Sequence, residues 1–161
     1  MRLAILADTH MPKGQRELPE RCLAELGAAD AIVHLGDFSA VSVLERLESF
    51  GKPVHAVHGN VDDAEVRRRL PEELEVELEG VRLALVHDSG PRRGRLERLR
   101  ARFPGADAVL FGHSHLPLHE ERDGFQIFNP GSPTERRRAP TRTMGIGTIE
   151  DGRIEFELVD L

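Results

Sequence analysis

Most of the residues that can bind a metal or move a proton stand directly after short apolar runs of the sequence. Asp8 and His10 follow residues 3–7, and Asp37 follows residues 31–35. The same arrangement recurs for Asn60 after 53–57, His87 after 81–86, and His113 and His115 after 106–111. Runs of this kind are typical of buried strands in an α/β sheet. Because the carboxyl ends of parallel strands form one edge where ligands bind, we expect these side chains to converge.

The spacing of two histidine-containing pairs predicts a site for two metal ions. In Asp8-Thr9-His10 and in His113-Ser114-His115, residues i and i+2 lie on the same side of an extended chain. Gly112 allows a sharp turn before the second pair. Carboxylate, amide and imidazole groups are also available after three other strands, from Asp37, Asn60 and His87. We expect the two oxygens of Asp37 to bridge both ions, with Asn60 and His87 completing the coordination.

The mixed nitrogen and oxygen ligands indicate a transition metal rather than calcium. Manganese is our first expectation, with nickel, iron, zinc and cobalt as alternatives, because these residue types do not separate them. With a bridging hydroxide, two divalent ions and two aspartates leave a formal charge of about +1, which favours an anion such as a phosphate ester. Two such ions activate water for in-line attack on phosphorus, so no serine or cysteine nucleophile is needed.

Elements expected from the hydrophobic pattern can position these residues. Strands and helices alternate in the first half, with helices over 19–29, 41–50, 93–103 and a short one ending at Leu70. Turns at Glu79-Gly80 and Asp151-Gly152 predict hairpins of 74–78 with 81–86 and of 144–149 with 153–159. From Leu116 onward the chain is expected to be antiparallel. The chain of 161 residues predicts one α/β domain, residues 1–161, of two packed sheets flanked by helices.

The ordered motifs resemble those of the calcineurin-like metallophosphoesterase superfamily. They are Asp8-x-His10, Gly36-Asp37, Gly59-Asn60-x-Asp62, His87 and Gly112-His113-Ser114-His115. The short length and Asn129-Pro130-Gly131-Ser132 resemble its small branch of bacterial and archaeal phosphodiesterases, over residues 1 to about 135. The resemblance implies a four-layer αββα sandwich of two mixed β-sheets and a dinuclear site.

The same resemblance assigns roles to the site residues. It implies that one metal is bound by Asp8, His10, Asp37 and His115, and the other by Asp37, Asn60, His87 and His113. Asp37, Asn60 and His113 would be the catalytic residues. Asn60 would also face the substrate phosphate, and Ser132 would border the substrate pocket.

Two departures from the family pattern keep a second function open. Many members carry histidine directly after the motif asparagine, where this chain has Val61, so the usual proton donor is absent. The small branch often has His-Gly-His where this chain has His87-Asp88-Ser89. The first expectation is a phosphodiesterase that uses a hydroxide bridging two metals. The alternative is a catalytically weak or inactive scaffold module on the same fold, like the subunit of a membrane-trafficking coat.

The remaining polar residues are interpreted as structural. His34, His55, His58 and His119 are not assigned to the site, and Asp62 and Asp63 are expected to cap a helix. The arginine clusters at 67–69 and 136–138 are interpreted as solvated, and the alternative for the second cluster is contact with a phosphate.

The expected substrate is a small phosphodiester, and the sequence leaves its identity open. A net charge of −6 gives no case for binding nucleic acid or a membrane. The single cysteine, Cys22, excludes an internal disulfide, so we expect a cytoplasmic protein. The sequence leaves the oligomeric state open, and the members of the family branch that it resembles are often dimers or tetramers.

Overall fold

Two five-stranded sheets form the centre of the structure, a computed structural model that describes residues 1–161. The first sheet has the strand order β10-β9-β1-β2-β3. Its members are β1 (Arg2–Leu6), β2 (Ala31–His34), β3 (Val54–Ala56), β9 (Thr143–Glu150) and β10 (Arg153–Asp160). Strands β1, β2 and β3 are parallel, as predicted, and the hairpin β9–β10 joins β1 in antiparallel orientation.

The second sheet has the strand order β4-β5-β6-β8-β7. Its members are β4 (Glu73–Leu78), β5 (Val81–Val86), β6 (Ala108–Phe111), β7 (Leu118–Arg122) and β8 (Phe125–Asn129). The expectation of antiparallel pairing after Leu116 holds for β7 with β8, but β8 runs parallel to β6. The reason is that β7 lies at the sheet edge and carries the chain back, so β8 enters beside β6 in the same direction.

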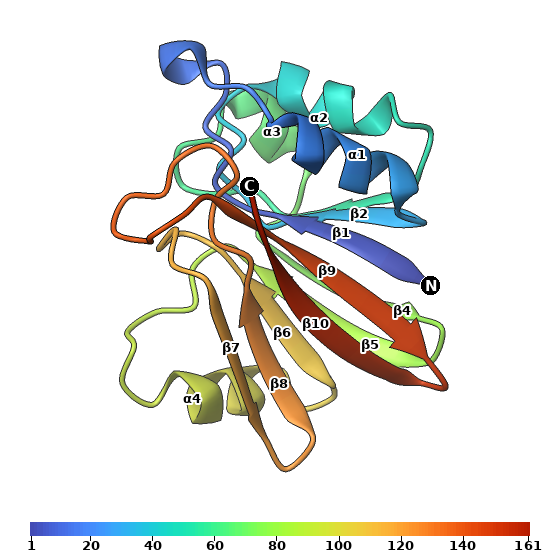
Figure 1. Cartoon of the computed structure of the whole chain (residues 1–161). Helices are drawn as coiled ribbons and strands as arrows, with labels where there is room; N and C mark the ends of the chain where they lie inside the picture. Colours follow the sequence, from blue (N-terminus) through green and yellow to red (C-terminus); the bar gives the residue numbers. More distant parts are fainter.

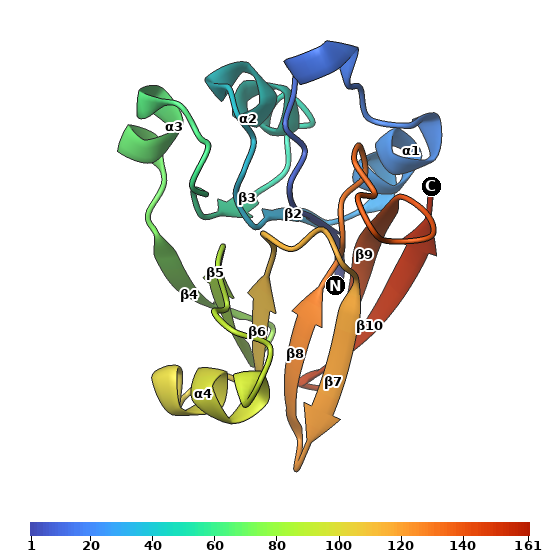
Figure 2. The ribbon, with the colours of Figure 1, turned by 90° about the vertical axis from the view of Figure 1, so that its left-hand side faces the viewer.

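Helices cover the outer face of each sheet (Figures 1 and 2). Helices α1 (Glu20–Ala28), α2 (Val41–Glu48) and α3 (Ala64–Arg69) lie over the first sheet, and α4 (Arg95–Arg102) lies over the second. A short 3-10 helix, Lys13–Gln15, was not expected from the sequence. None of these helices has the length and apolar character needed to cross a bilayer.

Three hydrophobic cores separate four layers, which confirms the predicted sandwich. One core joins α1, α2 and α3 to the first sheet, one lies between the sheets, and one joins the second sheet to α4. In β1, Ala4 and Leu6 belong to the outer core, whereas Leu3 and Ile5 belong to the core between the sheets. Burial on both faces explains why such strands are continuous apolar runs.

Candidate metal centre

The predicted ligands meet at one edge of the sandwich. They lie in the loops that follow β1, β2 and β3 of the first sheet and β5 and β6 of the second. Five of them have left-handed backbone conformations, with φ of 55° at Asp8, 46° at His10, 58° at Asp37, 69° at His113 and 58° at His115. Such conformations are uncommon for residues other than glycine and cluster at functional sites. The loops are therefore bent sharply to bring these side chains together.

A first group consists of Asp8, His10 and His115. The Nε2 atoms of His10 and His115 are 3.1 Å apart, and Asp8 Oδ1 lies 3.5 Å from His115 Nε2 and 3.9 Å from His10 Nε2. All three residues are buried. Three ligand atoms thus surround one point, in a mixture of one carboxylate and two imidazoles that suits a divalent transition metal.

A second group consists of Asp37, His87 and His113. His87 Nε2 lies 3.3 Å from Asp37 Oδ2 and 3.3 Å from His113 Nδ1. The side-chain oxygen of Asn60 joins this group, at 3.1 Å from His87 Nε2 and 3.0 Å from His113 Nδ1. Asn60 therefore offers its neutral oxygen to the same point as the other three residues.

Asp37 lies between the two groups. Its Oδ2 is 3.3 Å from His87 Nε2 in the second group and 3.7 Å from His10 Nε2 in the first, and its Oδ1 accepts a hydrogen bond of 3.0 Å from the Val61 backbone. Burial alone would raise the pKa of Asp37, but the hydrogen bond and charge of His87 outweigh it and lower the pKa to about 2. This carboxylate is thus ionised and within reach of both points.

The environment of Asp8 fits a bound cation. Both of its carboxylate oxygens are buried and have no hydrogen-bond partner. Burial raises the pKa of this carboxyl to about 8. An unpaired buried carboxylate is costly, whereas a divalent ion at the first group would neutralise it. The donor set and this orphaned carboxylate together fit a metal.

Backbone carbonyls orient two of the imidazoles. His87 Nδ1 donates to the Leu35 carbonyl oxygen at 2.7 Å, and His115 Nδ1 donates to that of Glu135 at 3.0 Å. Each bond would leave the Nε2 atom free to ligate the proposed metal, the arrangement found for metal-ligating histidine. Burial lowers the pKa of His10, and it lowers that of His115 to about 4, so both rings are neutral, as ligands must be.

Asp62 has a role that the sequence did not indicate. It does not cap α3: its carboxylate accepts hydrogen bonds from the backbone N–H groups of Asp37 at 3.0 Å, Ser39 at 2.8 Å and Gly59 at 2.7 Å. Asp63 is the cap, with Oδ1 accepting from the Val66 backbone at 2.8 Å. Asp62 therefore joins the loop after β2 to the loop after β3 and fixes the Asp37 backbone. The signal available in the sequence was its position in the motif Gly59-Asn60-x-Asp62.

Arg67 was interpreted as part of a solvated cluster, but it supports the site. Its guanidinium donates to the carbonyl oxygens of Asn60 at 2.7 Å and Asp62 at 3.0 Å. A cavity of about 310 Å³ opens beside the second group, and both Arg67 and His58 line it together with Asn60 and His113. His58 was not assigned to the site, so its position at this cavity corrects that interpretation.

Ser132 lies behind the ligands rather than at the cavity. It is 1% exposed, and its hydroxyl donates to the Asp8 carbonyl oxygen at 2.8 Å. Thr134 similarly donates to the Thr9 carbonyl oxygen at 2.8 Å. The expected contact of Ser132 with substrate therefore has no counterpart in this geometry, which instead assigns it to positioning the Asp8 backbone.

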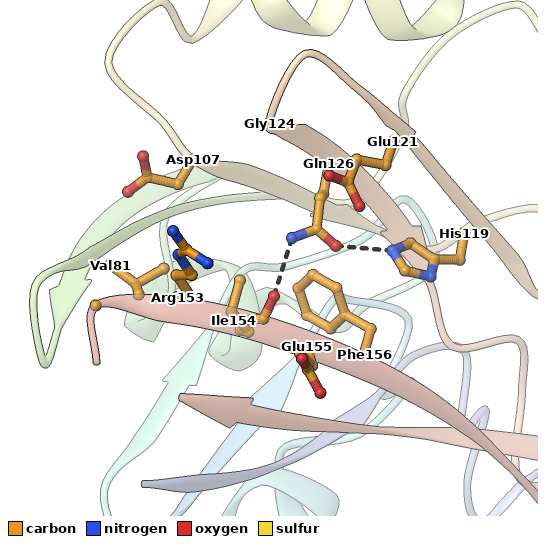
Figure 3. Close-up of a pocket in the computed structure, with 11 residues that line it drawn as sticks. Val81, Asp107, His119, Glu121, Gly124, Gln126, Arg153, Ile154, Glu155 and Phe156 are labelled. Atoms are coloured by element: carbon orange, nitrogen blue, oxygen red, sulfur yellow. Dashed lines mark hydrogen bonds between the residues drawn. The ribbon is translucent and has the colours of Figure 1, made fainter. Parts of the chain in front are cut away.

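Two histidines interpreted as structural make no side-chain hydrogen bond to a proposed ligand: the partner of His34 is the Thr9 hydroxyl at 3.2 Å, and that of His119 is Gln126. His34 is fully buried, stacks on Phe38 and has a pKa lowered to about 3 by burial. His119 lines a separate hollow of about 670 Å³ between β10 and the β7–β8 hairpin (Figure 3). There it contacts Gln126 at 2.8 Å, and Gln126 donates to the Ile154 carbonyl oxygen at 2.9 Å, which ties the two sheets together. None of the predicted ligands lines this hollow.

Comparison with known proteins gives concordant matches. A probable metallophosphoesterase of Methanothermobacter thermautotrophicus is 30% identical over 99% of this chain and 92% of its own length. The phosphodiesterase YfcE of Escherichia coli K12 is 33% identical over 82% of this chain and 79% of its own length. The crystal structure of Vps29 from Entamoeba histolytica, complexed with zinc, has a TM-score of 0.80 and 21% identity, and the match covers 99% of both chains. At this identity the last match bears on the fold alone.

The family model for the calcineurin-like phosphoesterase superfamily domain matches residues 1–152. The matched region contains both groups of candidate ligands and the strands after which those ligands lie. The chain therefore belongs to the calcineurin-like phosphoesterase superfamily, as its motifs indicated.

Proposed function

We propose that this protein is a metal-dependent phosphodiesterase that hydrolyses its substrate by in-line attack of water on phosphorus. The observation that carries the proposal is the position of Asp37 Oδ2, which lies within 3.7 Å of a ligand nitrogen in each group. A carboxylate in that position can bridge two neighbouring ions. When bound, two divalent ions supply the acidity that produces hydroxide from water at neutral pH and the charge that stabilises the transition state.

The seven proposed ligands have separate tasks. One ion would be held by Asp8, His10 and His115. The other would be held by His87, His113 and Asn60, and Asp37 would keep the two ions close together. They come from loops with fixed backbone contacts, so their geometry is set before substrate arrives.

Asn60 and His113 are the residues suited to contact the phosphate. Both are exposed and line the cavity beside the second group. With the Asn60 oxygen directed at the histidines, its amide N–H groups are free to donate to a phosphoryl oxygen. His113 faces the group through Nδ1, which leaves its Nε2–H as a second donor.

The leaving group must depart without a histidine after Asn60, because that position is Val61. Val61 has no proton to give, and 47% of its surface is exposed beside the site. Esters with an acidic leaving group need no proton donor, so they should react fastest.

The test is hydrolysis of bis(p-nitrophenyl) phosphate after addition of Mn²⁺, with Ni²⁺, Zn²⁺, Co²⁺ and Fe²⁺ compared at equal concentration. We expect turnover that depends on added metal and that falls at least about a hundredfold in Asp37→Asn and His113→Gln, because losing a ligand costs more than losing its supporting hydrogen bonds. His119→Gln is the matched control, since His119 is also an exposed histidine but lies at the other hollow.

The same measurement decides on the alternative of a scaffold module. Its motivation is Val61 together with the fold shared with Vps29. The only exposed large hydrophobic residues are Val61, Leu116 and Leu158, which is scattered exposure of an ordinary kind. Metal binding without turnover of any phosphodiester would favour the scaffold and contradict the proposed enzyme.

A further inference from the structure

The guanidinium of Arg67 holds the two peptide carbonyls on either side of Val61. It donates from Nη2 to the Asn60 carbonyl oxygen at 2.7 Å and from Nε to the Asp62 carbonyl oxygen at 3.0 Å. Arg67 belongs to α3, which begins directly after this loop, so its side chain reaches back from the helix. Val61 itself offers no polar side-chain group to a substrate. A positive charge is therefore fixed beside a position that cannot donate a proton.

Arg67 also lines the cavity of about 310 Å³ beside the second group. Asn60 and His113, the residues suited to contact the phosphate, line the same cavity. A substituent of that phosphate which extends into the cavity therefore approaches Arg67. The guanidinium uses Nε and Nη2 for its two carbonyl contacts, and its Nη1 makes no hydrogen bond in the structure. Donors of Arg67 are thus available to an oxygen in the cavity.

None of the other charged residues that line the cavity is a partner of Arg67. These residues are Glu72, Asp88 and Arg102. Arg102 forms an ion pair with Glu73, and Asp88 accepts a hydrogen bond of 2.8 Å from the Gly90 backbone. Glu72 and Asp88 are both exposed, so water and salt screen their charges, and neither forms an ion pair with Arg67.

The carboxylates of the segment around Arg67 have other partners. Asp62 accepts from three backbone N–H groups, Asp63 caps α3, and Glu65 forms an ion pair with Arg68 at 2.6 Å. The only contacts of the Arg67 guanidinium are therefore neutral carbonyl oxygens, and its charge remains available to an anion.

We propose that Arg67 is a catalytic residue that stabilises negative charge on the leaving oxygen of the phosphodiester. The inference rests on the phosphodiesterase function proposed above. In that reaction the oxygen of water bonds to phosphorus and its proton passes to the solvent. The bond from phosphorus to the leaving oxygen breaks, its electron pair stays on that oxygen, and the anion takes up a proton from water after it departs. A guanidinium stabilises such an anion by a charge-assisted hydrogen bond and gives up no proton.

Leaving groups of graded acidity test this role. Methyl p-nitrophenyl, methyl p-chlorophenyl and methyl phenyl phosphate share the scissile bond and differ in how much charge the leaving oxygen carries. Arg67→Gln should lower kcat/KM about ten- to a hundredfold on the phenyl ester, the loss expected for a hydrogen bond to a charged group. On the p-nitrophenyl ester, whose anion is delocalised, we expect a loss of about threefold or less. Chromatographic measurement of each released phenol gives the rates.

Arg68→Gln is the matched control. Arg68 is the next residue of α3 and is exposed, but its side chain pairs with Glu65 and does not line the cavity. This variant should keep the rates and the leaving-group dependence of the wild-type protein. A loss in Arg67→Gln that is equal on all three esters would show that Arg67 only holds the loop, and would overturn the inference.

Binding of inorganic phosphate gives a readout without turnover. One of its oxygens can occupy the position of the leaving oxygen, so calorimetric titration of the Mn²⁺-supplemented protein should show about tenfold weaker binding in Arg67→Gln than in the wild-type protein or Arg68→Gln. Titration with Mn²⁺ alone should give equal affinities in all three proteins. A loss of metal affinity in Arg67→Gln, or an unchanged affinity for phosphate, would contradict the role of Arg67.

The two proposals fail in different ways. If the wild-type protein hydrolyses none of the three esters with added metal, the phosphodiesterase function fails. If it hydrolyses them and Arg67→Gln shows the same dependence on the leaving group, only the role of Arg67 fails.

Discussion

Asp8 is the residue whose surroundings depend most on a cation. Its two oxygens are buried without partners, and burial raises its pKa to about 8. Without metal, the folded protein therefore holds a proton on Asp8 up to that pH, whereas the unfolded chain releases it near pH 4. Since the folded state binds the extra proton, the contribution of Asp8 to stability falls as pH rises from about 4 to about 8.

The variant Asp8→Asn tests this assignment. In chelator, the difference in Tm between the variant and the wild-type protein should shift in favour of the variant as pH rises from 5 to 8, because asparagine has no proton to lose. In the presence of Mn²⁺ at pH 8 the order should reverse, because the wild-type carboxylate gains a metal and the amide does not. Thermal denaturation at both pH values checks both statements, and a pH-independent difference in chelator would contradict them.

Asp62 positions Asp37 without being a proposed ligand. Its carboxylate accepts three backbone hydrogen bonds, from Asp37, Ser39 and Gly59. Asp62→Ala should therefore destabilise the fold by about 3 kcal/mol or more, because buried N–H groups lose a charged acceptor. It should also weaken metal binding about 10- to 100-fold, as loss of a supporting contact does.

Asp63→Ala is a suitable comparison for this variant. The Asp63 side chain caps α3 and accepts from the Val41 backbone at 3.0 Å, whereas its bond to the loop of Asp37 runs from its backbone N–H to the Ser39 carbonyl oxygen at 3.2 Å and is kept in alanine. We expect a smaller loss of Tm and unchanged metal affinity, measured by metal titration. Equal metal affinities of the two variants would show that Asp62 has no special part in the site.

At the residue scale, spacing predicted which side chains meet but not how they are supported. Asp8, His10 and Asp37 were identified because each follows an apolar strand, a property that is local in the sequence. The contacts of Asp62 and Ser132 depend instead on how loops from distant segments fold against one another. No periodicity in the sequence encodes them, and short polar residues in such positions are equally typical of caps and turns.

At the element scale, the loops after the strands can approach closely only because glycines precede the ligands. A Cβ on Gly59 would lie 2.1 Å from Asp37 Oδ1, and one on Gly36 would lie 2.7 Å from His87 Nδ1. Real atoms do not approach so closely, so both positions require glycine. Gly36 thus leaves space for His87, and Gly59 leaves space for Asp37.

Gly59→Ala should displace Asp37 and reduce metal affinity at least about tenfold, with a stability loss of about 1–3 kcal/mol from overpacking. Gly27→Ala, in α1, is the control, since a Cβ there meets nothing within 4 Å. It should raise stability by about 0.5–1 kcal/mol, because alanine favours a helix, and leave metal binding unchanged. Denaturant unfolding and metal titration of both variants check these expectations.

The elements were largely predictable, whereas their pairing was not. Apolar runs and helical spacing located every strand of the first sheet and helices α1, α2, α3 and α4. Strand β7, with its sequence Leu118–Arg122, is mostly exposed and polar, so it carries little hydrophobic signal. The parallel contact of β6 with β8 follows from the position of β7 at the sheet edge, which the hydrophobic pattern alone does not reveal.

At the scale of the whole molecule, the proposed metal centre joins the two sheets. In the first group, Asp8 and His10 follow β1 of one sheet and His115 follows β6 of the other. In the second group, Asp37 follows β2, and His87 and His113 follow β5 and β6. Each ion would therefore be held by both sheets at once.

Removal of metal should consequently lower the stability of the entire fold. A ligand present at 100 times its Kd stabilises the folded state by about 2.7 kcal/mol per site, so Tm should fall on chelation and recover on addition of Mn²⁺. His87→Ala should retain only part of this response, because the first group remains complete. A Tm of the wild-type protein that is indifferent to chelator and metal would contradict the cross-linking role.

The division of the ligands between the sheets also bears on the order of folding. Strand β1 pairs with β9, so the first sheet is complete only when the final hairpin of the chain has joined it. Neither sheet alone contains all ligands of either group, and the nascent chain cannot complete both groups before His115 has been synthesised. The metals should thus act late, slowing unfolding of the assembled sandwich without accelerating its early collapse.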